Sequence, residues 1–83
     1  MNKLSTIQQI VHDHGNEIIF DRPVTVCLPT GTFEVYGLNM NEGLWLMGGQ
    51  GEWHGPLQEG QVNAGVVIDA IYRRIKSRHL EAA

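Results

Sequence analysis

The chain has 83 residues, of which 42% are hydrophobic and 18% charged, a balance that excludes a disordered chain and suits one domain over residues 1–83. No apolar run approaches the roughly 20 residues needed to cross a bilayer, and the N-terminus lacks the apolar core of a secretion signal. We therefore expect a soluble, cytoplasmic protein without membrane contact. The single cysteine, Cys27, excludes an internal disulfide, and its place in a strand pattern indicates a small buried hydrophobe.

Charge is unevenly distributed along the chain. Residues 1–69 carry two basic residues against eight carboxylates, whereas residues 70–83 carry four basic residues against one carboxylate. The sequence thus describes an acidic body with a basic C-terminal end, and an acidic body repels the phosphates of nucleic acid.

The first predicted element is a helix over residues 3–14. Its apolar residues recur at spacings of three and four and so share one face: Leu4, Ile7, Ile10 and Val11. Asn2 or Ser5 can cap its start, and Gly15-Asn16 ends it, because both residues tolerate the left-handed conformation.

The middle of the chain changes to a period of two, which is typical of strands. We predict strands at residues 17–20, 24–28, 33–38, 44–47 and 52–54. The connections between them are too short for parallel crossovers, so the sheet should be an antiparallel meander of four or five strands.

A longer helix is predicted from residue 59 or 60 to residue 79. Its apolar stripe has helical spacing: Ala64, Val67, Ile68, Ile71, Ile75 and Tyr72. Gly65 interrupts this helix and would be explained by a close approach to the sheet. The predicted fold class is therefore α+β, in the order αβββββα.

Strand alternation divides the sheet residues into two faces. The first is the predicted core face: Ile18, Phe20, Val24, Val26, Leu28, Phe33, Val35, Leu44 and Leu46. The second collects Thr25, Cys27, Tyr36, Leu38, Trp45, Met47 and Trp53. This second face is about half apolar, whereas a sheet with one solvated face should be polar there.

Three interpretations of the second face stay open. The two helices can cover opposite faces, so that the aromatic residues form a second core layer. Alternatively, both helices cover one face and the aromatic face meets a protein partner or a second copy of the chain. Finally, an aromatic platform can stack on single-stranded nucleic acid, which the acidic body disfavours.

The glycine-rich segment Gly48-Gly49-Gln50-Gly51 has two interpretations. Glycines before a helix can form a phosphate loop, but the Gly-Lys-Ser/Thr ending and the parallel strand context are missing. Glu52 and Glu59 would also place negative charge beside an anion. We therefore expect hairpin turn chemistry here.

No constellation of residues predicts an enzyme. His12 and His14 are two residues apart on a helix and cannot chelate one ion, and no spacing resembles a zinc site, so we expect no metal or cofactor. His54 beside Trp53 is the best acid–base candidate, but a small meander with two helices has little space for a deep pocket.

Four cations cluster near the C-terminus: Arg73, Arg74, Lys76 and Arg78. They can offset the partial negative charge of a helix C-terminus, or they can contact nucleic acid or another anion.

These patterns together predict a non-enzymatic interaction module, which binds a protein partner or a second copy as a homodimer. The predicted contact residues are Tyr36, Trp45, Met47 and Trp53. The alternatives are a nucleic-acid accessory protein that uses the basic helix end, and a small-ligand binder at the glycine-rich hairpin.

Overall fold

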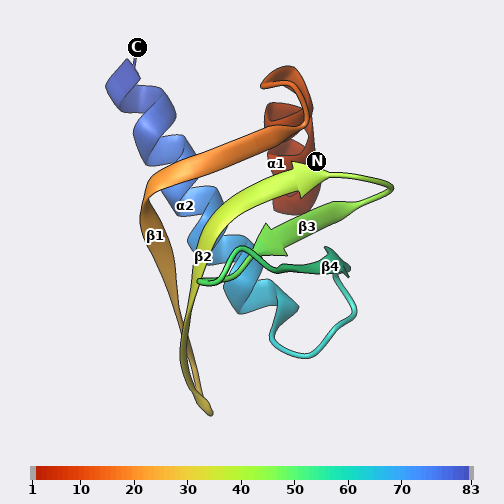
Figure 1. Cartoon of the computed structure of the whole chain (residues 1–83), viewed down its shortest axis with the longest axis vertical. Coiled ribbons are helices and arrows are strands. Elements are labelled where there is room, and N and C mark those ends of the chain that lie inside the picture. Colours follow the sequence, from red (N-terminus) through yellow and green to blue (C-terminus); the bar gives the residue numbers. More distant parts are fainter. Residues whose placement is uncertain (1, 83) are drawn as a thin grey trace.

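The helices and strands follow one another in the order that the sequence pattern predicts. The sheet has four strands, the lower of the two predicted numbers. The computed structural model describes the backbone of residues 2–82 and the side chains of residues 2–77. The order is α1 (Lys3–Asp13), β1 (Glu17–Leu28), β2 (Gly31–Met40), β3 (Leu44–Met47), β4 (Trp53–Leu57) and α2 (Ala64–Ala82) (Figure 1). The strands form one antiparallel sheet in the order β1-β2-β3-β4, which confirms the α+β meander.

α1 is capped at both ends by residues that the sequence singles out. The Asn2 side chain accepts a hydrogen bond from the backbone N–H of Ser5 at 2.7 Å, which satisfies one of the free donors of the first turn. Gly15 and Asn16 have φ angles of 78° and 69°, the left-handed conformation that turns the chain into β1.

β1 joins two predicted strands into one bent strand. Pairing with β2 is regular up to Ile19 and resumes at Val24, so residues 20–23 lie opposite Tyr36 alone. Extra residues in one strand bend it and increase its twist. Pro23 fits this irregular segment because it lacks a backbone N–H.

The same irregularity shifts the phase of β2. Val35 and Leu38 are both fully buried in the core although they are three residues apart. Tyr36 and Gly37 between them therefore break the alternation of the strand. The sequence prediction that Leu38 shares the second face with Tyr36 is wrong, because strict alternation does not survive a bulge.

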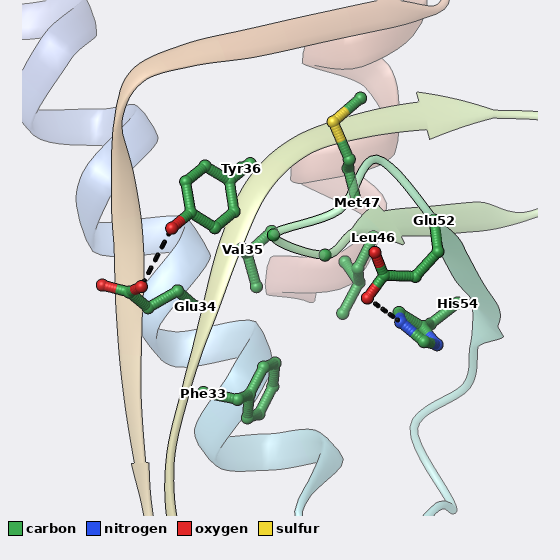
Figure 2. A pocket seen from close by; sticks show the side chains of 10 residues that line it. Phe33, Glu34, Val35, Tyr36, Leu46, Met47, Glu52 and His54 are labelled. Carbon is green, nitrogen blue, oxygen red and sulfur yellow. Dashed lines mark hydrogen bonds and ion pairs between the residues drawn. The ribbon is translucent and has the colours of Figure 1, made fainter.

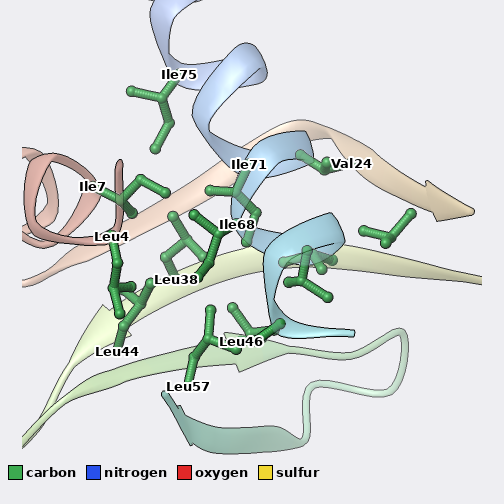
Figure 3. Packing of buried hydrophobic residues seen from close by; sticks show 14 of the residues in the cluster. Leu4, Ile7, Val24, Leu38, Leu44, Leu46, Leu57, Ile68, Ile71 and Ile75 are labelled. Carbon is green, nitrogen blue, oxygen red and sulfur yellow. The ribbon is translucent and has the colours of Figure 1, made fainter. Parts of the chain in front are cut away.

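Both helices pack on the same face of the sheet, and the core lies between them and the strands (Figure 3). α1 contributes Leu4, Ile7 and Val11, and α2 contributes Ala64, Val67, Ile68, Ile71 and Ile75. The strands contribute Val24, Val26, Val35, Leu38, Leu44, Leu46 and Leu57. Among residues 2–82, no helix lies on the other face of the sheet.

α2 starts later than predicted. Asn63 has a φ of 66°, a left-handed conformation that no α-helix contains, so the helix begins at Ala64 rather than at residue 59 or 60. A side chain at Gly65 would meet no atom within 4 Å, so the expected close approach of helix and sheet is wrong. Neither helix in the described part of the chain combines the length and the hydrophobicity needed to span a bilayer.

Candidate functional site

The face of the sheet without helices, here called the outer face, holds the aromatic residues singled out by sequence. Strand pairing places these residues on it: Glu17, Ile19, Thr25, Cys27, Glu34, Asn39, Trp45, Met47 and Trp53. The Tyr36 phenol joins them through its hydrogen bond to Glu34. Met47 and Trp53 are direct cross-strand partners. Trp45, Met47 and Trp53 are half-buried, and Ile19 is 56% exposed.

Cys27 also lies on the outer face. It pairs with Thr32 in the β1–β2 hairpin and is exposed. The sequence prediction of a buried cysteine is therefore wrong, because the helices cover only the opposite side of this strand.

Trp45 is held against the β4 segment by a specific contact. Its indole N–H donates a hydrogen bond to the backbone carbonyl of Asn41 at 2.8 Å. A side chain at Gly55 would lie 3.1 Å from the indole and 3.0 Å from the Leu44 carbonyl oxygen, so the ring packs directly on glycine backbone. This contact fixes the orientation of the indole on the outer face.

A cavity of about 500 Å³ opens between the first half of β2 and the β3–β4 hairpin (Figure 2). Its apolar lining comes from Phe33, Val35, Leu46 and Met47. Its polar lining comes from Glu34, Tyr36, Glu52 and His54. The cavity is open at the edge of the sheet, because β3 ends at Met47 while β2 extends further.

On the β2 side of the cavity, Tyr36 and Glu34 form a hydrogen-bonded pair. The phenol donates to Glu34 Oε1 at 3.0 Å. The pKa of the Tyr36 phenol is raised, first because this hydrogen bond favours the protonated form and second because the Glu34 charge opposes a phenolate.

On the hairpin side, the Glu52 carboxylate folds back over its own turn. It accepts the backbone N–H of Gln50 at 2.9 Å and lies 3.2 Å from His54 Nε2 (Figure 2). The pKa of Glu52 is lowered, first by the hydrogen bond to its own backbone N–H, and then by His54 and Gln50. The rim of the cavity thus carries an ionised carboxylate.

The glycine pair of this hairpin is explained by what lies against it. A side chain at Gly48 would come within 2.1 Å of Glu52 Oε2, and one at Gly49 would lie 3.3 Å from the Tyr36 ring. The missing side chains therefore leave space for the Glu52 carboxylate beside Gly48 and for the Tyr36 ring beside Gly49. Hairpin chemistry was expected here, but the two neighbouring carboxylates Glu34 and Glu52 were not recognised as part of a site.

The basic residues of α2 have separate surroundings. The Arg74 guanidinium donates to the carbonyls of Arg22 and Pro23, lies 3.2 Å from Asp21 Oδ1, and stacks 5.2 Å from the centre of the Phe20 ring. It thereby satisfies backbone groups that the bend of β1 leaves outside the sheet ladder.

The other basic residues predicted to contact an anion are more exposed to solvent than Arg74. Arg73 and Lys76 are exposed, and Lys76 lies 5.9 Å from the centre of the Tyr72 ring. The side chain of Arg78 lies outside the described residues. The described part of the chain holds no group of three or more His, Cys, Asp or Glu residues placed for a metal ion.

Comparisons of the chain with protein-family models, with curated proteins and with solved structures gave no match.

Proposed function

We propose that the protein is a non-enzymatic interaction module, which binds a protein partner through the outer face of its sheet. The observation that carries the proposal is the packing of both helices on the opposite face. It leaves the half-buried Trp45, Met47 and Trp53 and the exposed Ile19 on the face that neither helix of the described residues covers. Aromatic residues and methionine are enriched at the centres of protein interfaces, and contiguous exposed apolar surface marks interaction sites.

Charge favours a different protein as the partner over a second copy of the chain. Glu17 and Glu34 occupy paired positions of the outer face, and Glu52 borders it at the hairpin. Among the described residues, no Lys or Arg occupies a paired strand position on this face. Two copies placed face to face would bring like charges together, so the complementary surface is one with basic residues around an apolar centre.

A photo-crosslinking experiment tests this proposal. A photoreactive amino acid is placed at Ile19 on the outer face or at Val66, which is 43% exposed on α2, and both variants are expressed in the cells from which the gene comes. We expect position 19, and not position 66, to crosslink to a distinct protein with a basic contact segment. We also expect Trp53→Glu to abolish the crosslink while the circular dichroism spectrum stays unchanged.

Other results of that experiment would contradict the proposal. Equal crosslinking from both positions would show no preference for the outer face. A product with twice the mass of the chain, together with a dimer in analytical ultracentrifugation, would replace the partner by a second copy.

A second candidate function is the binding of a small ligand at the glycine-rich hairpin. The observation that favours it is the cavity of about 500 Å³, which lies within the usual size range of small-molecule sites. Thermal-shift screening with a compound library tests it, with His54→Ala as the comparison. Stabilisation of the original chain but not of the variant supports a ligand site, and the absence of any stabilisation removes the support for it.

A further inference from the structure

We propose that the partner contacts this protein with an extended peptide segment, which adds as a strand to the open edge of β2 and alternates apolar residues with Lys or Arg. This inference rests on the proposed interaction function and names its mode and the chemistry of the partner. Three observations carry it: an unpaired strand edge, an apolar cavity beside that edge, and carboxylates on both sides of the cavity.

The unpaired edge belongs to residues 31–36. β2 pairs with β1 from Gly31 to Val35, but its pairing with β3 begins only at Gly37, opposite Met47. The chain then leaves the sheet at Gly48 and turns into the hairpin. In the part of the chain that the structure describes, no strand covers the second edge of residues 31–36. An antiparallel strand directs alternate backbone N–H and C=O groups to each side, so this edge offers hydrogen-bonding groups to another strand.

The other exposed edges of the sheet carry features that discourage strand addition. β1 is bent over residues 20–23 and contains Pro23, and β4 contains Pro56. Proline and bulges protect edge strands because they interrupt the row of donors. The stretch from Gly31 to Tyr36 contains neither proline nor lysine, so it lacks the features that would discourage pairing with another strand.

The cavity provides the apolar part of the recognition. Phe33, Val35 and Leu46 line it along the edge of the core (Figure 2). A strand laid beside residues 31–36 directs every second side chain to the core side, the side of Phe33 and Val35. Those peptide positions should therefore be apolar.

The charges set the remaining peptide positions. The intervening side chains of an added strand point to the outer face, where Glu34 lies, and Glu52 faces the same cavity from the hairpin. Neither Lys nor Arg is among the residues that line the cavity. Cationic side chains in the peptide would complement these carboxylates, whereas pairing with a second copy would gather the Glu34 and Glu52 carboxylates of both copies in a short stretch of sheet.

Synthetic peptides test the inference directly. Three capped octapeptides are compared by NMR titration of the isotope-labelled protein: alternating Lys and Val, alternating Glu and Val, and the Lys–Val peptide methylated on alternate backbone nitrogens. We expect the first to shift the amide signals of residues 32–36 and of Gly48 and Gly49, and to bind at least tenfold more tightly than the other two. Glu34→Gln and Glu52→Gln should each weaken binding several-fold, and Glu42→Gln in the distant β2–β3 turn should not.

The controls separate this inference from the proposed function. Equal binding of the methylated peptide would show that strand pairing is not used, and equal binding of the Glu–Val peptide would show that the carboxylates select nothing. If no peptide binds while position 19 still crosslinks to a protein, the outer face is an interface but the strand-addition mode is wrong. If the Lys–Val peptide binds as expected while position 19 yields no crosslink, strand addition stands and the proposed use of the whole outer face fails.

Discussion

The Tyr36 phenol and the Glu34 carboxylate are coupled through one hydrogen bond of 3.0 Å. The pKa of Tyr36 is raised by this bond and by the Glu34 charge, so its phenol should ionise at a higher pH than an ordinary tyrosine. The chain has two tyrosines, and Tyr36→Phe identifies which titration belongs to Tyr36. Glu34→Gln should move that titration to lower pH, because it removes the charge that opposes the phenolate.

Ultraviolet absorbance of the phenolate during an alkaline titration measures this effect. Tyr72 serves as the internal control, since it lies on α2 away from Glu34. An unchanged Tyr36 titration in Glu34→Gln would mean that the pair does not form in solution.

Two glycines of the chain should respond in opposite ways to alanine. A side chain at Gly37 would lie 2.9 Å from the Ile18 carbonyl oxygen and 2.9 Å from Ile19 Cδ1, whereas one at Gly65 meets nothing within 4 Å. Gly37→Ala should therefore lower the free energy of unfolding by about 1–3 kcal/mol, as overpacking does. Gly65→Ala should raise it by about 0.5–1 kcal/mol, because alanine favours the helix.

Urea denaturation of the two variants measures both changes. The same sign for both variants would contradict the different surroundings of the two glycines. The sequence identifies Gly65 as unusual, but the close approach to the sheet expected there is wrong. A sequence shows the position of a glycine and not which atoms face it in the fold.

At the scale of elements, Arg74 connects α2 to the bend of β1. Its guanidinium satisfies the carbonyls of Arg22 and Pro23 and stacks on Phe20. Arg74→Met keeps much of the aliphatic stem but removes these donors, so it should lower the free energy of unfolding by about 1–3 kcal/mol. Arg73→Met at the neighbouring exposed position should change it by less than about 0.5 kcal/mol.

Chemical denaturation compares these two arginine variants. Equal effects would show that the contacts to the bend contribute nothing to stability. The comparison also bears on the anion-contact hypothesis, because an arginine held by its own chain has fewer donors to offer to phosphate than an exposed one.

Alternation of side chains predicts the faces of these strands only where their pairing is regular. It correctly placed the strand at 44–47 and most of the core face, because alternation holds wherever pairing is regular. It failed at Leu38, because residues 20–23 of β1 lie opposite Tyr36 alone and shift the phase of β2. Such a bulge is set by the register between two strands, which neither strand shows by itself.

At the scale of the whole molecule, the arrangement of the helices decides which surface is available. The helical stripes were predictable, and the structure buries Leu4, Ile7 and Val11 of α1 as that pattern requires. The face of the sheet that α1 covers was left open, because an amphipathic helix needs an apolar surface and this sheet has two. The candidate cavity could not be predicted either, since it results from strands of unequal length.

Leu38 and Ile19 test this arrangement as a matched pair, because they belong to adjacent strands and face opposite sides of the sheet. Leu38 is fully buried in the core, whereas Ile19 is 56% exposed on the outer face. Leu38→Ala should lower the free energy of unfolding by about 2–5 kcal/mol, because it leaves a cavity in the core. Ile19→Ala should change it by less than about 0.5 kcal/mol.

Denaturation of the isolated protein measures both values, and the concentration dependence of the Ile19→Ala result adds a further comparison. If Ile19→Ala costs as much as Leu38→Ala at every concentration, the outer face is covered within the chain. If the Ile19→Ala cost grows with concentration, a second copy buries that face. A small, concentration-independent cost is the expected result, because a surface kept for a different protein contributes little to the stability of the isolated chain.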